Sequence, residues 1–224
     1  AELGDGAPVK LIGGADIDSI FLNGYNYKSL AFRTEIENNY IEALFDTNDE
    51  ALRLKANAGL NFSDKSLPVY DAKVLIEHAD LNAMNINRRD SISVLSADVE
   101  LNANGTSFDD LNGKLQIANA AYQTVGRGCE TDLVELSMKS NEDARTLELS
   151  SEFADAVFES RTAYKNVVYY LKNLLAQYTP MFYDAETRQN INEHILQIGD
   201  ERAALSVTTK YIDPLLNCIT DDIE

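Results

Sequence analysis

The sequence predicts a mainly β protein whose strands form a long antiparallel meander, with one or two helices near the C-terminal end. Three observations favour this fold class. Apolar residues alternate with polar residues or glycine without an error from Leu52 to Phe62, which is typical of a strand with one buried face. Asn-Gly pairs, which favour tight turns, separate segments with similar alternation of apolar and polar residues. From Ser160 onward the apolar spacing becomes helical.

The alternating segment from Leu52 to Phe62 is the longest predicted strand. Successive side chains of a strand point to opposite faces, so one face carries the apolar residues and the other carries the polar ones. At about 3.3 Å per residue the segment spans roughly 35 Å, well beyond the length of an average strand. The apolar residues on this face are Leu52, Leu54, Ala56, Ala58, Leu60 and Phe62.

Further strands of the meander are predicted between Tyr25 and Phe158. These strands are Lys28 to Glu37, Tyr40 to Phe45, Val69 to His78, Val94 to Ala103, Lys114 to Ala121, Leu133 to Lys139, Thr146 to Ser151 and Ala154 to Glu159. Asn and Gly tolerate the positive φ of tight turns, so turns are expected where these two residues adjoin. The expected turns are Asn23-Gly24, Asn104-Gly105 and Asn112-Gly113.

The segment 160–199 is predicted to be helical. From Tyr164 to Tyr178 apolar residues recur every three or four positions, which indicates an amphipathic helix ended by Pro180. Asp184 is expected to cap a second helix that runs to about Ile198. The first helix presents an apolar stripe, and the apolar face of the sheet is the expected partner for it.

Alternation returns from Leu205 to Tyr211, so the chain is expected to rejoin the sheet before Asp213-Pro214. The expected organisation is therefore a sheet region (1–159), a helical segment (160–199) and a returning strand with an acidic tail (200–224). We expect these parts to form one structural unit that belongs to a longer protein.

Composition excludes some classes of partner. The net charge of −18 disfavours nucleic acid and anionic membrane surfaces, since both are bound through Lys and Arg. The sequence has no apolar stretch long enough to span a membrane and no signal-peptide pattern at its start. Cys129 and Cys218 are the only cysteines, and two buried thiols are a better expectation than a disulfide.

No catalytic, cofactor or metal site is predicted. The sequence has no nucleophile elbow, no phosphate-binding loop and no paired metal-ligand motif. His78 continues the apolar phase of its strand, so a partly buried structural imidazole is expected, and His194 falls within the second helix. Asp109-Asp110 and Asp221-Asp222 lack the spacing of a calcium loop, and we interpret them as a solvated turn and tail.

Several short sequence segments follow one another in a recognisable order. They are Gly24-Tyr25-Asn26-Tyr27-Lys28-Ser29-Leu30, Ala79-Asp80-Leu81-Asn82-Ala83-Met84, Asp90-Ser91-Ile92-Ser93, Leu111-Asn112-Gly113-Lys114-Leu115, Arg145-Thr146-Leu147-Glu148-Leu149 and Ser151-Glu152-Phe153-Ala154-Asp155-Ala156. A helix ending at Tyr178-x-Pro180 and the triplet Asp213-Pro214-Leu215 continue the order. In this order the chain resembles an internal segment of an AsmA-like, TamB-like translocation and assembly module protein of diderm bacteria.

The resemblance implies a periplasmic protein, anchored in the inner membrane by parts of the parent chain, whose sheet curls into a trough lined with apolar side chains. Such proteins are implicated in phospholipid transport to the outer membrane and in protein assembly there. The resemblance brings no enzymatic residues. It implies acyl chains as ligands and outer-membrane assembly proteins as possible partners. The groove candidates are Leu52, Leu54, Ala56, Leu60, Phe62, Val74, Ile76, Val99 and Leu101.

Two hypotheses remain at this point. In the first, the apolar face is an open groove that shields acyl chains from water. In the second, the chain is an exported β-rich interaction module or surface lipoprotein domain, and its apolar face is a core sealed by the helix from Tyr164 to Tyr178. What covers the apolar face distinguishes them.

Overall fold

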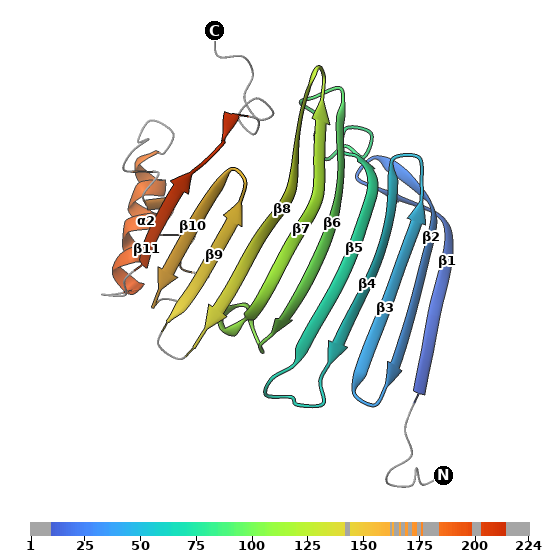
Figure 1. The fold of residues 1–224 in the computed structure, drawn as a ribbon, viewed down its shortest axis with the longest axis horizontal. Helices are drawn as coiled ribbons and strands as arrows, with labels where there is room; N and C mark the ends of the chain where they lie inside the picture. Colours follow the sequence, from blue (N-terminus) through green and yellow to red (C-terminus); the bar gives the residue numbers. More distant parts are fainter. Residues whose placement is uncertain are drawn as a thin grey trace.

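The computed structural model describes residues 10–141, 144–161, 163, 166, 169, 172, 173, 176, 184–198 and 203–213. In this part of the chain, eleven strands form one antiparallel sheet in which every strand pairs with the next along the sequence (Figure 1). The sheet is open, because its first and last strands do not pair with each other. The predicted mainly β meander with a helix near the C-terminus is therefore confirmed.

The strands are long, as the alternation predicted. They are β1 (Lys10–Leu22), β2 (Tyr25–Glu37), β3 (Tyr40–Asn48), β4 (Leu52–Asn61), β5 (Val69–Asp80), β6 (Ser93–Asn104), β7 (Asn112–Thr124), β8 (Arg127–Ser140), β9 (Arg145–Ser151), β10 (Ala154–Ser160) and β11 (Ala203–Thr209). β1 and the first residues of β8 were not predicted from the sequence.

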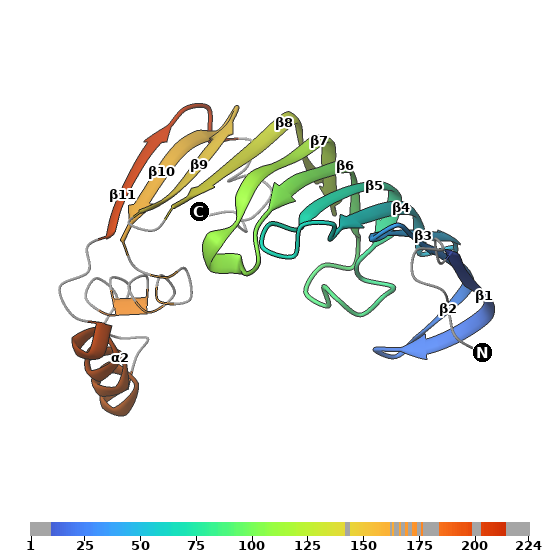
Figure 2. The same ribbon diagram turned by 90° about the horizontal axis from the view of Figure 1, so that it is seen from below.

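The sheet is strongly curved. Seen from below in Figure 2, it forms an arch with a concave side and a convex side. Twist of the same hand accumulates from strand to strand, and long strands in a wide sheet coil as a result. The curvature makes a trough, and the two faces of the sheet therefore differ in how closely their side chains lie together.

Turn chemistry explains several of the connections. Asn23 and Gly24 have φ of 52° and 80° between β1 and β2, so the predicted tight turn is confirmed. Gly105, with φ of 145°, directly follows β6. The predicted turn at Asn112-Gly113 is wrong, because both residues lie in β7. A Cβ on Gly113 would lie 2.6 Å from the Cβ of Ala103, so this glycine permits close approach of neighbouring strands.

A β-bulge changes the phase of β5. The register shifts between Ile76 and Ala79, and Ala79 lies opposite Leu95 of β6. His78 instead lies opposite Arg53 of β4. The expectation that His78 continues the apolar phase of Ile76 is therefore wrong, because the extra residue moves Ala79 onto that face.

Helix α2 (Ala185–Ile198) begins where the sequence predicts. The amide N of Thr187 donates to Asp184 Oδ1 at 2.7 Å, which confirms Asp184 as the cap. In Figure 2 the helix lies beside the concave side, at the β11 end of the arch. The helix predicted from Tyr164 to Tyr178 falls mostly outside the described residues. The described residues of that stretch, Asn166, Tyr169, Lys172, Asn173 and Ala176, are helical.

Candidate functional site

One face of the sheet is apolar across its whole width. Directly paired residues of an antiparallel sheet point to the same side, so the register follows a face from strand to strand. One such row contains only apolar residues and glycine, and it crosses all eleven strands. Its members are Leu11, Ile36, Ile41, Leu60, Tyr70, Ala103, Gly113, Met138, Leu147, Phe158 and Leu205.

Two parallel rows continue this face. The second consists of Gly13, Thr34, Ala43, Ala58, Ala72, Leu101, Leu115, Leu136, Leu149, Ala156 and Val207, and Thr34 is its only polar member. The third consists of Ala15, Phe32, Phe45, Ala56, Val74, Val99, Ile117, Val134 and Ser151, whose only polar member stands at its end. We call the side of the sheet that carries these three rows, with the apolar residues of the adjoining rows on that side, the apolar face.

The apolar face lies on the concave side. The connection between β5 and β6 packs on Leu52, Ile76 and Leu95, which belong to this face. Figure 2 shows the same connection beneath the arch. Side chains converge on the concave side of a curved sheet, and Leu60 and Val74 are half-buried while Lys55 and Lys73 on the other face are exposed.

The structure brings most of the sequence-predicted groove residues together. Seven of them lie on the apolar face through the register, namely Leu54, Ala56, Leu60, Val74, Ile76, Val99 and Leu101. Leu52 lies on the same face but packs against a buried cluster at one end. Phe62 lies one residue beyond β4, where its amide N donates to the Asn39 carbonyl at 2.9 Å.

Sequence reasoning missed the larger part of this surface. The strands β7, β8 and β9 contribute Leu115, Ile117, Val134, Leu136, Leu147 and Leu149. The same signal was present there, since these residues alternate with polar ones along each strand. What the sequence lacked was the register that joins the strands into one surface.

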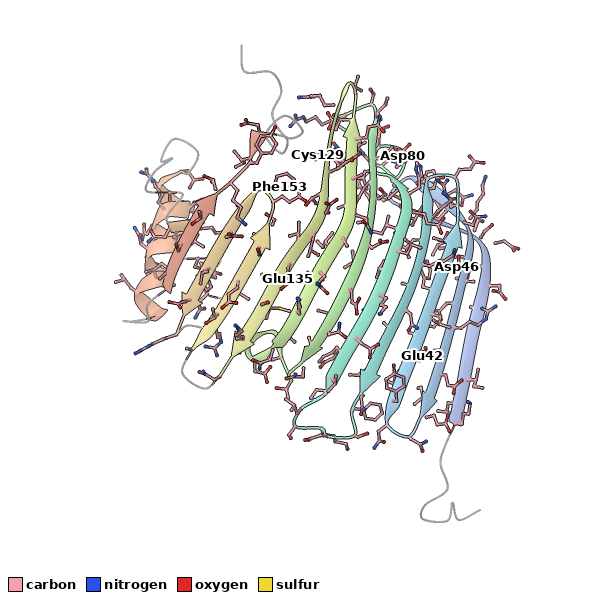
Figure 3. All side chains as sticks on the ribbon, in the orientation of Figure 1. Glu42, Asp46, Asp80, Cys129, Glu135 and Phe153 are labelled. Carbon is pink, nitrogen blue, oxygen red and sulfur yellow. The ribbon has the colours of Figure 1, made fainter. Side chains whose placement is uncertain are left out.

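The convex face is mainly polar and carries ion pairs between neighbouring strands, although Leu44, Leu75 and Leu133 are exposed on it. Figure 3 labels Glu42, Asp46 and Glu135 on this face. The pairs are Lys55 with Glu77 at 3.1 Å, Lys73 with Glu100 at 3.4 Å, Lys114 with Glu135 at 2.6 Å and Lys139 with Glu148 at 3.2 Å. The hydrogen bond to Glu77 raises the pKa of Lys55. Exposed pairs of this kind contribute little stability, but they keep this face solvated.

One end of the apolar face is closed by the β5–β6 connection, residues 81–92. Met84 is 3% exposed and forms a buried cluster with Tyr27, Ala51 and Ala79. The Asn23 side chain in the β1–β2 turn donates to the carbonyl oxygens of Met84 and Asn85, each at 3.1 Å. We call this cluster and its cover the closed corner.

A second polar contact holds the same connection to the sheet. Asn87 Nδ2 donates to Asp90 Oδ2 at 2.9 Å, and to Ser93 Oγ and the Tyr122 hydroxyl, each at 3.1 Å. The Ser93 and Tyr122 hydroxyls also lie 2.9 Å apart. Ser93 is fully buried, so this network satisfies a polar group that water does not reach.

A buried carboxylate supports the corner from the β3–β4 turn. Asp49 is 3% exposed and accepts hydrogen bonds from the Tyr25 hydroxyl at 2.7 Å, the Lys28 amide at 2.9 Å and the Ala51 amide at 2.8 Å. Burial opposes ionisation of Asp49, but these hydrogen bonds outweigh burial and lower its pKa. The hydrogen bond to Asp49 raises the pKa of Tyr25 to about 12.

The other candidates have structural explanations. Asp110 accepts hydrogen bonds from the side chain and amide of Thr106 and from the amide of Ser107, which hold its pKa far below the usual range. It therefore orders the turn at η1 (Phe108–Asp110). Among the described residues, no three His, Cys, Asp or Glu side chains are grouped as metal ligands would be. Cys218 and Asp221-Asp222 lie outside the described residues, so the pairing of Cys129 stays a prediction.

The fold defines the chain as a mainly β protein with one open, curved sheet that has one apolar and one mainly polar face. Comparison with known proteins adds no family, since no family model, curated protein or solved structure matches the chain. None of the described helices has the length and apolar character needed to cross a membrane.

Proposed function

We propose that the apolar face binds lipid acyl chains and shields them from water. The observation that supports this most directly is the row of apolar residues that crosses all eleven strands on the concave side. Over β7 to β9 the middle of this side is only half-buried, at Leu115, Leu136 and Leu149. The η1 segment reaches it at one end, where Ser140 and Arg145 donate to the Asp109 carbonyl. Contiguous apolar surfaces of more than a few hundred Å² are rare on monomers and mark binding sites.

Burial of area explains how such a face holds a lipid without specific polar residues. Each Å² of apolar surface removed from water contributes about 25 cal/mol, so affinity follows the length of chain that is covered. Neighbouring positions in the three rows are nearly equivalent in chemistry. An acyl chain therefore shifts along the face with little change in free energy, which suits transport better than storage.

Charge favours lipids whose headgroups carry no net charge. The chain has a net charge of −18, and acidic side chains such as Glu42 and Asp46 border the sheet on its convex side. An anionic headgroup is repelled by this field, whereas a zwitterionic one is not. We therefore expect zwitterionic phospholipids to bind better than anionic ones.

The sequence resemblance to translocation and assembly module proteins supports one cellular setting for this proposed activity. In that setting the chain is a periplasmic segment of an inner-membrane-anchored protein that bridges toward the outer membrane. It supports phospholipid transport to the outer membrane and protein assembly there, with outer-membrane assembly proteins as partners. No enzymatic step is part of this proposal.

The second candidate, an exported interaction module with a sealed core, has one observation in its favour. Met84 and its neighbours already cover part of the apolar face near Leu52 and Ala79. In that function the remaining apolar residues would be buried by protein rather than by lipid.

A photo-crosslinking amino acid at Leu101 tests the proposal. Leu101 lies on the apolar face, whereas Leu75 lies on the convex face of the neighbouring strand and is 40% exposed. The same probe at Leu75 is the matched control. We expect cells that carry the full-length protein to give a phospholipid adduct at position 101 and none at position 75. Equal labelling at the two positions, or protein adducts alone at position 101, would contradict acyl-chain binding.

A further inference from the structure

The chain contains three Asn-Gly pairs, and the fold places them in different surroundings. They are Asn23-Gly24, Asn104-Gly105 and Asn112-Gly113. Because glycine has no Cβ, its backbone nitrogen reaches the preceding asparagine side chain more easily than that of a larger residue. The structure then decides which pair reacts, since the attack needs a free amide and a backbone that can rotate.

Two of the pairs are held by backbone contacts. The Gly105 amide donates to the Pro68 carbonyl at 3.1 Å. Gly113 lies inside β7, where this strand packs closely against β6. The Asn112 side chain also accepts a hydrogen bond from the Ser140 amide at 2.7 Å. These contacts prevent rotation of both backbones, so both pairs are protected in the folded protein.

Asn23-Gly24 has neither restraint. Both residues are exposed, and they form the turn beyond the last paired residues of β1 and β2, Leu22 and Tyr25. Within the described part of the chain, the Gly24 amide donates to no backbone carbonyl. Of the three pairs, this is therefore the one in which the glycine nitrogen is available as a nucleophile.

The Asn23 side chain holds the closed corner. Its Nδ2 donates to the carbonyl oxygens of Met84 and Asn85, each at 3.1 Å. Only the amide nitrogen of an asparagine side chain can donate, so these two acceptors fix its orientation. A carboxylate in the same place would have no proton to donate and would face two carbonyl oxygens. Both hydrogen bonds would be lost, and the contact would become repulsive.

We propose that Asn23-Gly24 is a site of spontaneous deamidation, and that the reaction releases residues 81–92 from the β1–β2 turn. The Gly24 nitrogen loses its proton to hydroxide and attacks Asn23 Cγ. The Cγ–Nδ2 bond breaks, and the leaving nitrogen takes a proton from water and departs as ammonia. Water then opens the cyclic imide and leaves aspartate or isoaspartate at position 23. The closed corner thus contains a latch that opens once, and this inference does not depend on acyl-chain binding.

Peptide mapping of the protein after incubation at mildly alkaline pH tests which pair reacts. Conversion of the amide to an acid changes the mass of the peptide, and chromatography separates isoaspartate from aspartate. The contacts of Asn23 lie at an exposed turn and open more readily than contacts within the sheet, so position 23 should convert at least about tenfold faster than positions 104 and 112. In urea the three rates should become similar. Equal rates in the folded protein, or faster conversion at either other position, would overturn the assignment.

Hydrogen exchange of the converted protein tests the release. In the fraction converted at position 23, and in Asn23→Asp, exchange at the amides of Met84, Asn85 and Ile86 should accelerate about tenfold, as expected for the loss of one or two hydrogen bonds. Asn39→Asp is the matched control, because Asn39 is exposed in the β2–β3 turn with φ of 64°. This variant adds the same charge and should leave these amides unchanged. Unchanged exchange in the converted protein, or equal acceleration in the control, would overturn the latch.

Discussion

The closed corner and the open span of the apolar face are made of the same kinds of residues and behave differently. In the corner, Ala79 and Met84 are 5% and 3% exposed because residues 81–92 cover them. In the span over β7 to β9, Leu115 and Leu149 are only half-buried. An apolar sheet face therefore becomes a core or a groove according to what lies on it, and one molecule contains both outcomes.

The largest expected effect comes from placing a charge in each region. Ala79→Asp buries a carboxylate without a partner and should lower the free energy of unfolding by about 3–5 kcal/mol. Leu115→Asp on the open span should cost about 1 kcal/mol and should abolish acyl-chain binding. Urea denaturation measures the first effect and lipid titration the second. Similar costs for both variants would show that the open span is also sealed core.

The carboxylate that supports the corner is expected to have the next largest effect. Asp49→Ala leaves the Tyr25 hydroxyl and the amides of Lys28 and Ala51 without their acceptor, which should cost about 2–3 kcal/mol near neutral pH. Asp46→Ala, on the exposed convex face, is the control and should change stability by less than about 0.5 kcal/mol.

The stabilisation by Asp49 should depend on pH. Its pKa is lower in the folded protein than in the unfolded chain, so its contribution is complete above the unfolded value near 4 and is lost as the pH falls through the folded value. Urea denaturation across this range should show the wild type and Asp49→Ala converging in acid. A constant difference down to acidic pH would contradict this role of the ionised carboxylate.

The smallest expected effect comes from Tyr122, which lies at the border between the closed corner and the open span. Tyr122→Phe removes the hydroxyl that binds Asn87 and Ser93, at an expected cost of about 1 kcal/mol. Hydrogen exchange should accelerate at the amides of Met84 and Ile86 but not in the middle of β8. Tyr70→Phe, at the other end of the same face, is the control. Unchanged exchange at Met84 would mean that the Tyr122 contact does not hold residues 81–92 on the sheet.

Strands were predicted correctly where apolar and polar residues alternate cleanly. Prediction failed where a strand has apolar residues on both faces, or where a bulge shifts the alternation by one residue. In β1, Leu11 and Ile12 are consecutive and point to opposite faces, and two glycines follow them, so the alternation signal is weak. Pairing with β2 makes this segment a strand. At Gly113 a turn-forming dipeptide lies inside a strand because neighbouring backbones approach closely there.

The candidate groove was predicted only in part, because a sequence shows alternation within each strand but not the register between strands. The residues of β4, β5 and β6 were identified because each strand alternates strongly. The equivalent residues of β7 to β9 were not joined to them, since a single sequence does not reveal which residues of distant strands lie opposite each other. The phase change at His78 was also hidden, because a bulge depends on the pairing of two strands.

The order of polar and apolar residues along the chain was sufficient to specify long strands, their connection as a meander and an apolar face on each strand. That information is local, because alternation and turn chemistry act over a few residues. The alignment of these faces into one surface, its position on the concave side and its closure by residues 81–92 were decided by tertiary structure. Twist, register and the folding back of a connection depend on residues far apart in sequence, and no local pattern contains them.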